Sequence, residues 1–251
     1  MATQAISGRE RVFTSGSAPC TNTIPETSTP ECLSPIFAGF SQRELTEVLS
    51  SARTRVFVRD ELLYSQGQTV RNLIVLKSGS VKHTQLSPNG DEVLLRMSGT
   101  GEAVNLQADL SACSQSCSAR AMEQCQAWVW EYARVQDLLQ RYPQLRVNIT
   151  QVLAARLHEL EERFREIATE KVARRLALVL LRLMKHVGKH CEGGVQVSLS
   201  REELAQMTGT TLFTISRILS KWAEQGVVAP KREAVVIRDA ARLQTVTDYE
   251  I

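Results

Sequence analysis

The chain has 251 residues, of which 43% are apolar, so it is long enough to hold two domains with cores of their own. Neither a membrane-length apolar run nor a secretory signal is visible, so we expect a cytoplasmic protein without membrane contact. The net charge of +3 is unevenly distributed, with 13 Lys/Arg against 9 Asp/Glu from residue 168 onward. That excess favours a phosphate-binding C-terminal half.

The N-terminal half reads as a short tail followed by a β-rich domain. Residues 1–33 are rich in Ser, Thr and Pro, and we expect them to be disordered or loosely attached. After a capped helix beginning at Ser41, short apolar runs alternate with turn residues up to residue 97, and a last strand is expected at residues 127–130. This spacing favours a small sandwich or barrel, which we assign to residues 34–142.

A long helix is predicted at residues 143–168, and its apolar side chains follow a heptad repeat with charged residues, including Glu166, on the other faces. We interpret this repeat as a dimerisation seam, because a two-fold axis gives a DNA reader its half-site spacing. The alternative is a helix packed on the β-domain of its own chain. The seam residues are Leu153, Leu157, Leu160, Phe164 and Ile167.

The stretch from Ser198 to Gly226 predicts a helix-turn-helix. Ser200 and Glu203 form a capping box, Gly209 ends the first helix, and Thr210 or Thr211 caps the second. An ordinary helical hairpin is the alternative. A buried stripe of Ile215, Ile218, Leu219 and Trp222 leaves the opposite face for DNA. The expected DNA-binding residues of this unit are Thr210, Thr211, Leu212, Phe213, Ser216, Arg217, Ser220 and Lys221.

A β-hairpin with a basic tip at Lys231 and Arg232 follows and predicts a wing, which completes a DNA-binding domain at residues 169–251. Arg217 can donate two hydrogen bonds to a guanine, and Phe213 can pack on a thymine methyl group. The threonines and lysines, together with Arg232, are placed for phosphates. The fold class expected from all segments is therefore α+β, with a β-roll, a dimerisation helix and a winged helix-turn-helix.

Several short motifs in this order resemble the CRP/FNR family of bacterial transcription regulators over about residues 34–245. They are Gly79-Ser80-Val81-Lys82, Pro88-Asn89-Gly90-Asp91-Glu92, Gly101-Glu102, Ser118-Ala119-Arg120-Ala121 and Thr214-Ile215-Ser216-Arg217. The resemblance implies an effector-binding β-roll, a homodimer, a palindromic DNA site and RNA polymerase as a partner. The last motif is closer to the FNR branch than to the cyclic-AMP branch, although Phe213 stands where FNR-type readers often carry Glu.

The cyclic-AMP pattern of the family is not kept. Leu106 stands where the resemblance calls for a Glu, and the Arg-Ser pair for ribose and phosphate is replaced by residues around Gln115 to Cys117. Leu160-Glu161 replaces the Thr-Ser pair that meets the adenine. We therefore expect cyclic AMP not to be the effector.

Six cysteines stand at positions 20, 32, 113, 117, 125 and 191, and none forms a Cys-x-x-Cys pair. Family members that sense oxygen hold a [4Fe–4S] cluster on three N-terminal cysteines and one β-roll cysteine, whereas Trp130 stands at the β-roll position here. The cofactor is therefore unknown, with haem or an iron–sulfur cluster left open. The non-standard cluster set would be Cys20, Cys32, Cys113 and Cys117. The alternative for Cys32 and Cys125 is a small packed hydrophobe, and all four histidines are interpreted as solvated or packed side chains.

The loop where the family binds its effector is the expected sensing region. Cys113 and Cys117 could form a reversible disulfide, and Arg120 could lower the pKa of a thiol, so we hypothesise a redox, oxygen or nitric oxide signal or a small ligand. The alternative is ordinary free cysteines. Neither a phosphate loop nor a nucleophile elbow indicates an enzyme, and a non-DNA-binding interaction protein remains as a third class. The sensing residues are Asn105, Leu106, Gln107, Cys113, Ser116, Cys117, Arg120 and Leu160.

Overall fold

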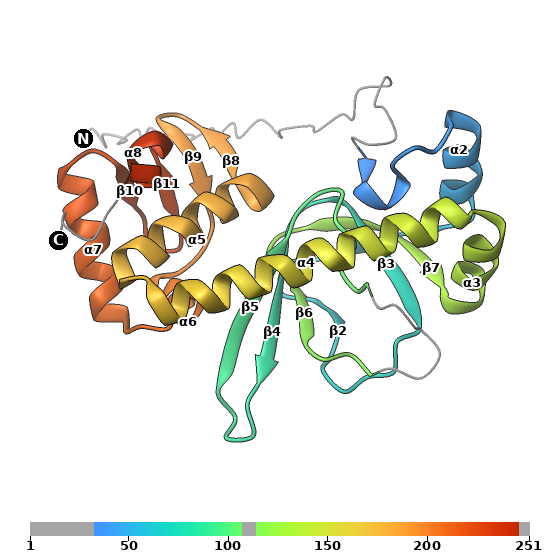
Figure 1. Cartoon of the computed structure of the whole chain (residues 1–251), viewed down its shortest axis with the longest axis horizontal. Coiled ribbons are helices and arrows are strands. Elements are labelled where there is room, and N and C mark those ends of the chain that lie inside the picture. The colour runs from blue at the N-terminus through green and yellow to red at the C-terminus, as the bar shows by residue number, and fades with distance from the viewer. Residues whose placement is uncertain (1–32, 107–113, 246–251) are drawn as a thin grey trace, which may run out of the picture.

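The structure, a computed structural model, describes residues 33–106 and 114–245. A β-rich half and a helix-rich half lie along one long helix, α4 (Pro143–Thr169), which crosses the whole molecule (Figure 1). This arrangement confirms the expected α+β architecture. Across the described ranges, no helix is both long and apolar enough to cross a membrane.

Two sheets form the β-roll. The three-stranded sheet has the order β1-β7-β3, and the four-stranded sheet has the order β2-β6-β4-β5. Their shared core contains Phe57, Leu76 and Ala119, all fully buried. Strand β6 was expected only as a sequence motif; its alanines alternate with Ser118 and Arg120 and let it pair closely with β4. The strands are β1 (Arg53–Phe57), β2 (Leu62–Tyr64), β3 (Asn72–Ser78), β4 (Val81–Leu86), β5 (Glu92–Ser98), β6 (Ser118–Ala121) and β7 (Cys125–Glu131).

Helices cover the outer face of the three-stranded sheet. They are η1 (Pro35–Phe37), α2 (Gln42–Ser50), α3 (Tyr132–Arg141) and the first turns of α4. The predicted capping box is confirmed, because the Ser41 hydroxyl accepts from the Glu44 amide and the Glu44 carboxylate accepts from the Ser41 amide at 2.8 Å. Trp130 is 1% exposed and donates its indole N–H to the Val48 carbonyl at 3.0 Å. This tryptophan therefore belongs to the packing of α2 on the sheet.

The helix-rich half begins with α5 (Val172–Val187), which is antiparallel to the end of α4 after a two-residue connection (Figure 1). A four-stranded sheet of order β10-β11-β9-β8 and a helix pair complete it. Pro230 lies in the edge strand β10, where its missing N–H costs no ladder hydrogen bond. The remaining elements are β8 (Lys189–Cys191), β9 (Gly194–Val197), α6 (Arg201–Thr208), α7 (Leu212–Glu224), β10 (Val228–Pro230), β11 (Val235–Ile237) and α8 (Ala240–Thr245).

The two halves are packed against each other through β5 and α6. Leu94 and Met97 of β5 are buried in the same apolar cluster as the helices of the C-terminal half. The Leu94 amide donates to the Gln206 side-chain oxygen at 3.2 Å, and Lys82 forms an ion pair with Glu203 at 3.0 Å. Both ends of that ion pair are less than one quarter exposed. The helix pair is therefore held on the β-roll of its own chain.

Candidate nucleic-acid interface and sensing region

The helix pair α6–α7 is built by the local signals found in the sequence. The Ser200 hydroxyl accepts from the Glu203 amide at 3.1 Å, while the Glu203 carboxylate accepts from the Ser200 amide at 2.9 Å. Gly209 ends α6 in the left-handed region at φ 61°, where a Cβ would be strained. Of the two candidate caps for α7, Thr211 is the one used, because its hydroxyl accepts from the Thr214 amide. The result is two packed helices joined by a short turn, as a helix-turn-helix requires.

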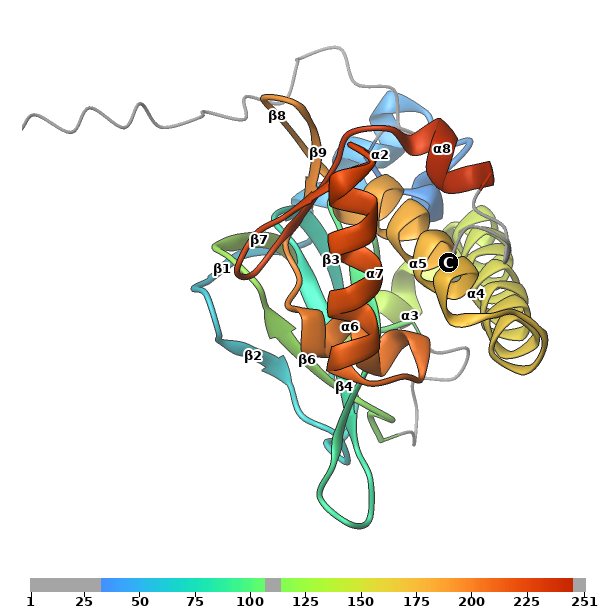
Figure 2. The same ribbon diagram turned by 90° about the vertical axis from the view of Figure 1, so that its left-hand side faces the viewer.

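One face of α7 is buried and the opposite face is open. Ile215 and Leu219 are fully buried, whereas Phe213 is 84% exposed. Phe213 and Arg217 are four residues apart, so they lie on one exposed face of the helix. Figure 2 shows α7 at the front of the molecule, with the hairpin of β10 and β11 beside it. Of the other predicted DNA-binding positions on this helix, Leu212 and Ser220 are exposed and Ser216 and Lys221 are half-buried.

The tip of the wing contacts the β-roll through one side chain and exposes another to solvent. Its turn is closed by a hydrogen bond from the Lys231 amide to the Ala234 carbonyl at 2.7 Å. The Lys231 ammonium donates to the Gln196 side chain at 2.7 Å, and Glu233 lies 3.5 Å from Arg59 of the β-roll. Arg232 is exposed. The two predicted phosphate-binding cations of the wing therefore differ, since Lys231 is already hydrogen bonded within the wing domain.

The interior of the β-roll holds a polar cluster that sequence reasoning did not anticipate. His83 is fully buried, and its ring nitrogens lie 3.3 Å from the Tyr64 hydroxyl and 3.0 Å from the Ser98 hydroxyl. Burial, followed by the positive charges of Arg96 and Arg156, lowers the pKa of His83 well below its ordinary value. Burial likewise raises the pKa of Tyr64. Tyr64 and His83 are therefore both uncharged near neutral pH and are linked by a hydrogen bond.

Two arginines border this cluster. Arg96 donates to the Ser98 hydroxyl at 2.5 Å and to the Val104 carbonyl at 2.7 Å, and Arg156 of α4 donates to the Ala103 carbonyl. Burial, with the nearby charge of Arg96, lowers the pKa of Arg156 to about 10, so it still carries its charge at neutral pH. In the sequence, Arg96 stands out only as an Arg within an apolar strand and Arg156 only as an Arg within the heptad helix.

The predicted sensing residues are distributed over several places. The Asn105 side chain accepts from the Ile74 amide and donates to the Asn72 carbonyl, while Leu106 packs in the core under α2 and α3. Arg120 donates to the Asp60 carbonyl at 2.5 Å, and the Cys117 sulfur lies 3.9 Å from the His83 ring. Cys117 therefore contacts the buried cluster through His83. Ser116 is exposed, and Gln107 and Cys113 lie outside the described residues.

The heptad repeat of α4 is largely open to solvent. Four seam residues are at least half exposed, from 50% for Ile167 to 74% for Phe164. Leu153, the first of the five, is instead half-buried against the β-roll core, as are the more N-terminal turns of the helix. The helix therefore packs on its own β-roll at one end and presents an apolar stripe along the rest. That stripe consists of Leu157, Leu160, Phe164 and Ile167.

A metal site built from cysteine and histidine side chains needs several of them at one place in the fold. The Cys125 thiol is buried and donates to the Ser80 carbonyl at 3.3 Å, as the packed hydrophobe expected there. Within residues 33–106 and 114–245, no group of three or more His, Cys, Asp or Glu side chains is arranged to hold a metal ion. Cys20, Cys32 and Cys113 of the non-standard cluster set lie outside those ranges. His186 pairs with Glu102 across the two halves at 2.6 Å.

The comparisons with known proteins match both halves. The cyclic nucleotide-binding domain model matches residues 54–142, and the Crp-like helix-turn-helix domain model matches residues 174–246. The cyclic AMP receptor protein of Thermus thermophilus is 29% identical over 214 residues, which cover 85% of this chain and 96% of that protein. The transcriptional activator protein Anr of Pseudomonas protegens is 24% identical, over 76% of this chain and 79% of that protein.

A solved structure supports the same fold. The c-di-GMP responsive global regulator CLP of Xanthomonas campestris superimposes with a TM-score of 0.65 at 23% identity, covering 78% of this chain and 99% of that one. Together with the helix pair and its open α7 face, these matches define a helix-turn-helix transcription regulator rather than an enzyme. The chain belongs to the CRP/FNR family.

Proposed function

We propose that the protein acts as a homodimer that binds a palindromic DNA site and recruits or contacts RNA polymerase, under the control of a signal sensed in the β-roll. The observation that supports the dimer best is the apolar stripe of α4. Four large side chains at heptad spacing are 50% to 74% exposed in the single chain, and such a stripe gains stability when a second copy covers it. A two-fold axis through α4 would present two copies of α7 to successive major grooves.

The oligomeric state tests this proposal directly. Sedimentation equilibrium of the wild-type chain should report a dimer, and Phe164→Asp should report a monomer because it places a charge in the stripe. Val147→Asp is the matched control, since Val147 is 47% exposed on the same helix but outside the heptad positions. Equal dissociation by both variants, or a monomeric wild-type chain, would contradict the proposed seam.

For DNA, we propose that α7 reads bases with Arg217, Phe213 and Ser216. Thr210, Thr211 and Lys221, with Lys231 and Arg232 of the wing, would hold the phosphates, while Leu212 and Ser220 lie on the same exposed side of the reader. Selection of bound fragments from a random DNA pool should return two inverted half-sites about one helical turn apart, which is roughly 34 Å. A pool that returns no common sequence would favour the interaction-protein alternative.

Cyclic AMP, which the name of the Thermus relative carries, is not the effector that we propose for this chain. A cyclic nucleotide needs donors for its phosphate and an acceptor for its ribose hydroxyl. Here no Lys or Arg stands between Arg96 and Arg120 in the sequence, and Leu106 is an apolar side chain packed in the core. The β-roll interior already satisfies its own polar groups through Tyr64, His83 and Ser98. These residues do not fit the nucleotide.

The signal that we propose is redox, oxygen, nitric oxide or a small ligand acting near Cys117. Its support is the sulfur's position against His83, at the rim of the buried cluster. Replacing Cys113 and Cys117 together by Ser should abolish regulation in vivo while DNA binding in vitro persists. Unchanged regulation would exclude the cysteines. Absorption of anaerobically purified protein would then separate a haem, with its Soret band, from an iron–sulfur cluster or an organic ligand.

A further inference from the structure

A cavity of about 660 Å³ lies where the β-roll, α4 and α5 meet. Its volume is in the range of small-molecule sites in proteins. One wall is the turn at Gly101–Ala103 with the end of β5, the second is a face of α4, and the third is α5, so both halves of the chain contribute. Neither Leu106 nor Cys117 lines it. The cavity is therefore separate from the residues expected to sense a signal.

Positive charge exceeds negative charge in this cavity. Arg96, Arg156 and Arg163 line it, and the acceptors of their hydrogen bonds are a hydroxyl and the carbonyls of Ala103, Val104 and Leu95. Those acceptors carry no formal charge. The acidic lining residues are Glu102, which pairs with His186, and Glu159. Arg182 is neutralised by Glu166, which leaves three guanidinium groups facing two carboxylates.

The arginines are also poorly hydrated. Burial lowers the pKa of Arg156 and of Arg163, and in both cases a neighbouring arginine lowers it further. A guanidinium group in such surroundings gains from an anion that it can bind in a bidentate manner. Apolar side chains, including Ile36, Val152 and Leu183, form another part of the wall.

We propose that this cavity is a binding site for a small organic anion with an apolar body. The anionic group would lie among the guanidinium groups of Arg96, Arg156 and Arg163, and the body would contact the apolar walls. The site takes a class of ligand that DNA binding does not require, so it is independent of the proposed function. Because its walls come from both halves, the ligand also stabilises their packed arrangement.

The probe for this site is 8-anilinonaphthalene-1-sulfonate, an aromatic sulfonate whose fluorescence rises in apolar surroundings. Wild-type protein should bind it saturably at one site per chain. The uncharged analogue N-phenyl-1-naphthylamine should bind at least tenfold more weakly, because it lacks the group that the arginines recognise. Equal binding of the two probes would overturn the proposal.

Variants then locate the site. Arg163→Gln should weaken sulfonate binding at least tenfold, whereas Arg146→Gln, an exposed position on the same helix, should leave it unchanged. Ala155→Phe fills the cavity while every arginine stays in place, so it should also abolish binding. The sulfonate should then raise the melting temperature of the wild type and of Arg146→Gln, but not that of Ala155→Phe. Binding that survives Ala155→Phe in a folded variant would assign the probe to another surface, such as the α4 stripe, and refute the site.

Discussion

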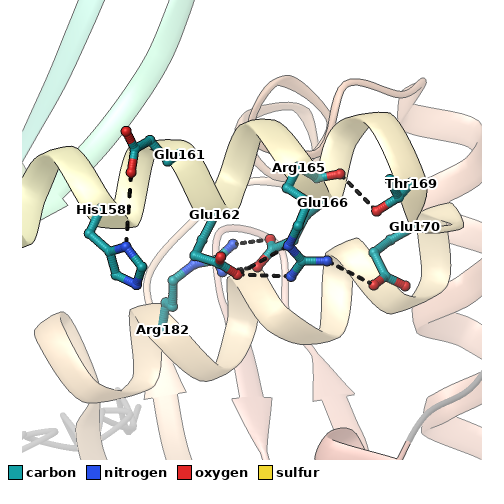
Figure 3. Close-up of polar contacts among 8 residues, drawn as sticks. All are labelled: His158, Glu161, Glu162, Arg165, Glu166, Thr169, Glu170 and Arg182. Atoms are coloured by element: carbon teal, nitrogen blue, oxygen red, sulfur yellow. Dashed lines mark hydrogen bonds and ion pairs between the residues drawn. The ribbon is translucent and has the colours of Figure 1, made fainter.

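Arg182 of α5 binds both carboxylate oxygens of Glu166 on α4, at 2.7 and 2.8 Å (Figure 3). The Glu166 side chain is only 7% exposed, whereas that of Arg182 is 24% exposed. Glu166 lies in the last turn of α4, which ends at Thr169, and Arg182 reaches it from the second half of α5. The pair therefore restrains the angle between α5 and the end of the long helix.

The first prediction concerns this ion pair. Arg182→Ala should lower the free energy of unfolding by about 2–3 kcal/mol, because it leaves a buried carboxylate without its partner. Arg165→Ala is the control, since Arg165 and Glu162 pair at 2.8 Å on the same helix but are roughly half exposed. Urea unfolding measures both. A loss no larger for Arg182→Ala than for Arg165→Ala would show that the pair is not a structural link.

The second prediction concerns Gly99, where β5 meets α5. A Cβ built on this glycine would lie 1.9 Å from the His186 carbonyl oxygen, so backbone must move to accept one. Gly99→Ala should therefore separate the two halves and expose the connection between α4 and α5 to protease. Gly90→Ala is the control, because its Cβ meets nothing within 4 Å, although at Gly90, unlike at Gly99, a positive φ is itself unfavourable for alanine. Equal protease resistance of the two variants would contradict the close approach.

The third prediction concerns pH. The hydrogen bond and charge of Glu102 raise the pKa of His186 above its ordinary value of 6.5. Burial works against ionisation of Glu102, but His186 and the two nearby arginines outweigh it and lower the pKa of this carboxyl group.

Because the pKa of His186 is raised in the folded state, the pair stabilises the protein fully below about pH 6.5, the ordinary histidine value. This stabilisation is lost as the pH rises through the folded-state pKa. His186→Gln should therefore flatten the pH dependence of unfolding above pH 6. His190→Gln, at an exposed position on β8, should not. If the wild-type protein became more stable than His186→Gln as the pH rose across this window, the stabilising role of the Glu102–His186 pair would be refuted.

The fourth prediction concerns specificity. Arg217→Ala should cost about 1–3 kcal/mol at one base pair of each half-site, because a bidentate contact to guanine is lost. Lys221→Ala should weaken binding about equally on all sequences, as a phosphate contact does. Competition gel shifts with the selected site and with random DNA measure the difference. Equal losses for Arg217→Ala on both DNAs would assign Arg217 to a phosphate instead.

The parts of the fold that were predictable rest on signals within a few residues. The two capping boxes, the left-handed Gly209 and the buried stripe of α7 depend only on neighbours along the chain, and all are present. The heptad repeat was interpreted as a dimerisation seam, which stays a prediction; four of its five side chains are exposed in the single chain, and Leu153 packs on the β-roll core. Glu166 was placed among the charged faces of that helix, but it is buried because Arg182 reaches it from another element.

The contacts between the halves could not be predicted in this way. Glu102 and His186 are 84 positions apart, and the close approach of Gly99 to α5 depends on how β5 and α5 pack. Neither residue carries a local pattern that marks its partner. The polar cluster inside the β-roll was missed for the same reason, because Tyr64, His83 and Ser98 come from three strands that only the folded sheet brings together.

The open stripe of α4 bears on how the amount of folded protein in a cell depends on its rate of synthesis. If stability is gained when a second copy covers Leu157 and Phe164, folding and assembly are one equilibrium, and its balance depends on the concentration of the chain. At low copy number the chain would spend more time with an uncovered apolar surface, which proteases and chaperones recognise. Above a threshold rate of synthesis, dimer formation would thus protect the chain from degradation. The level of the regulator would then rise more steeply than linearly with its rate of production.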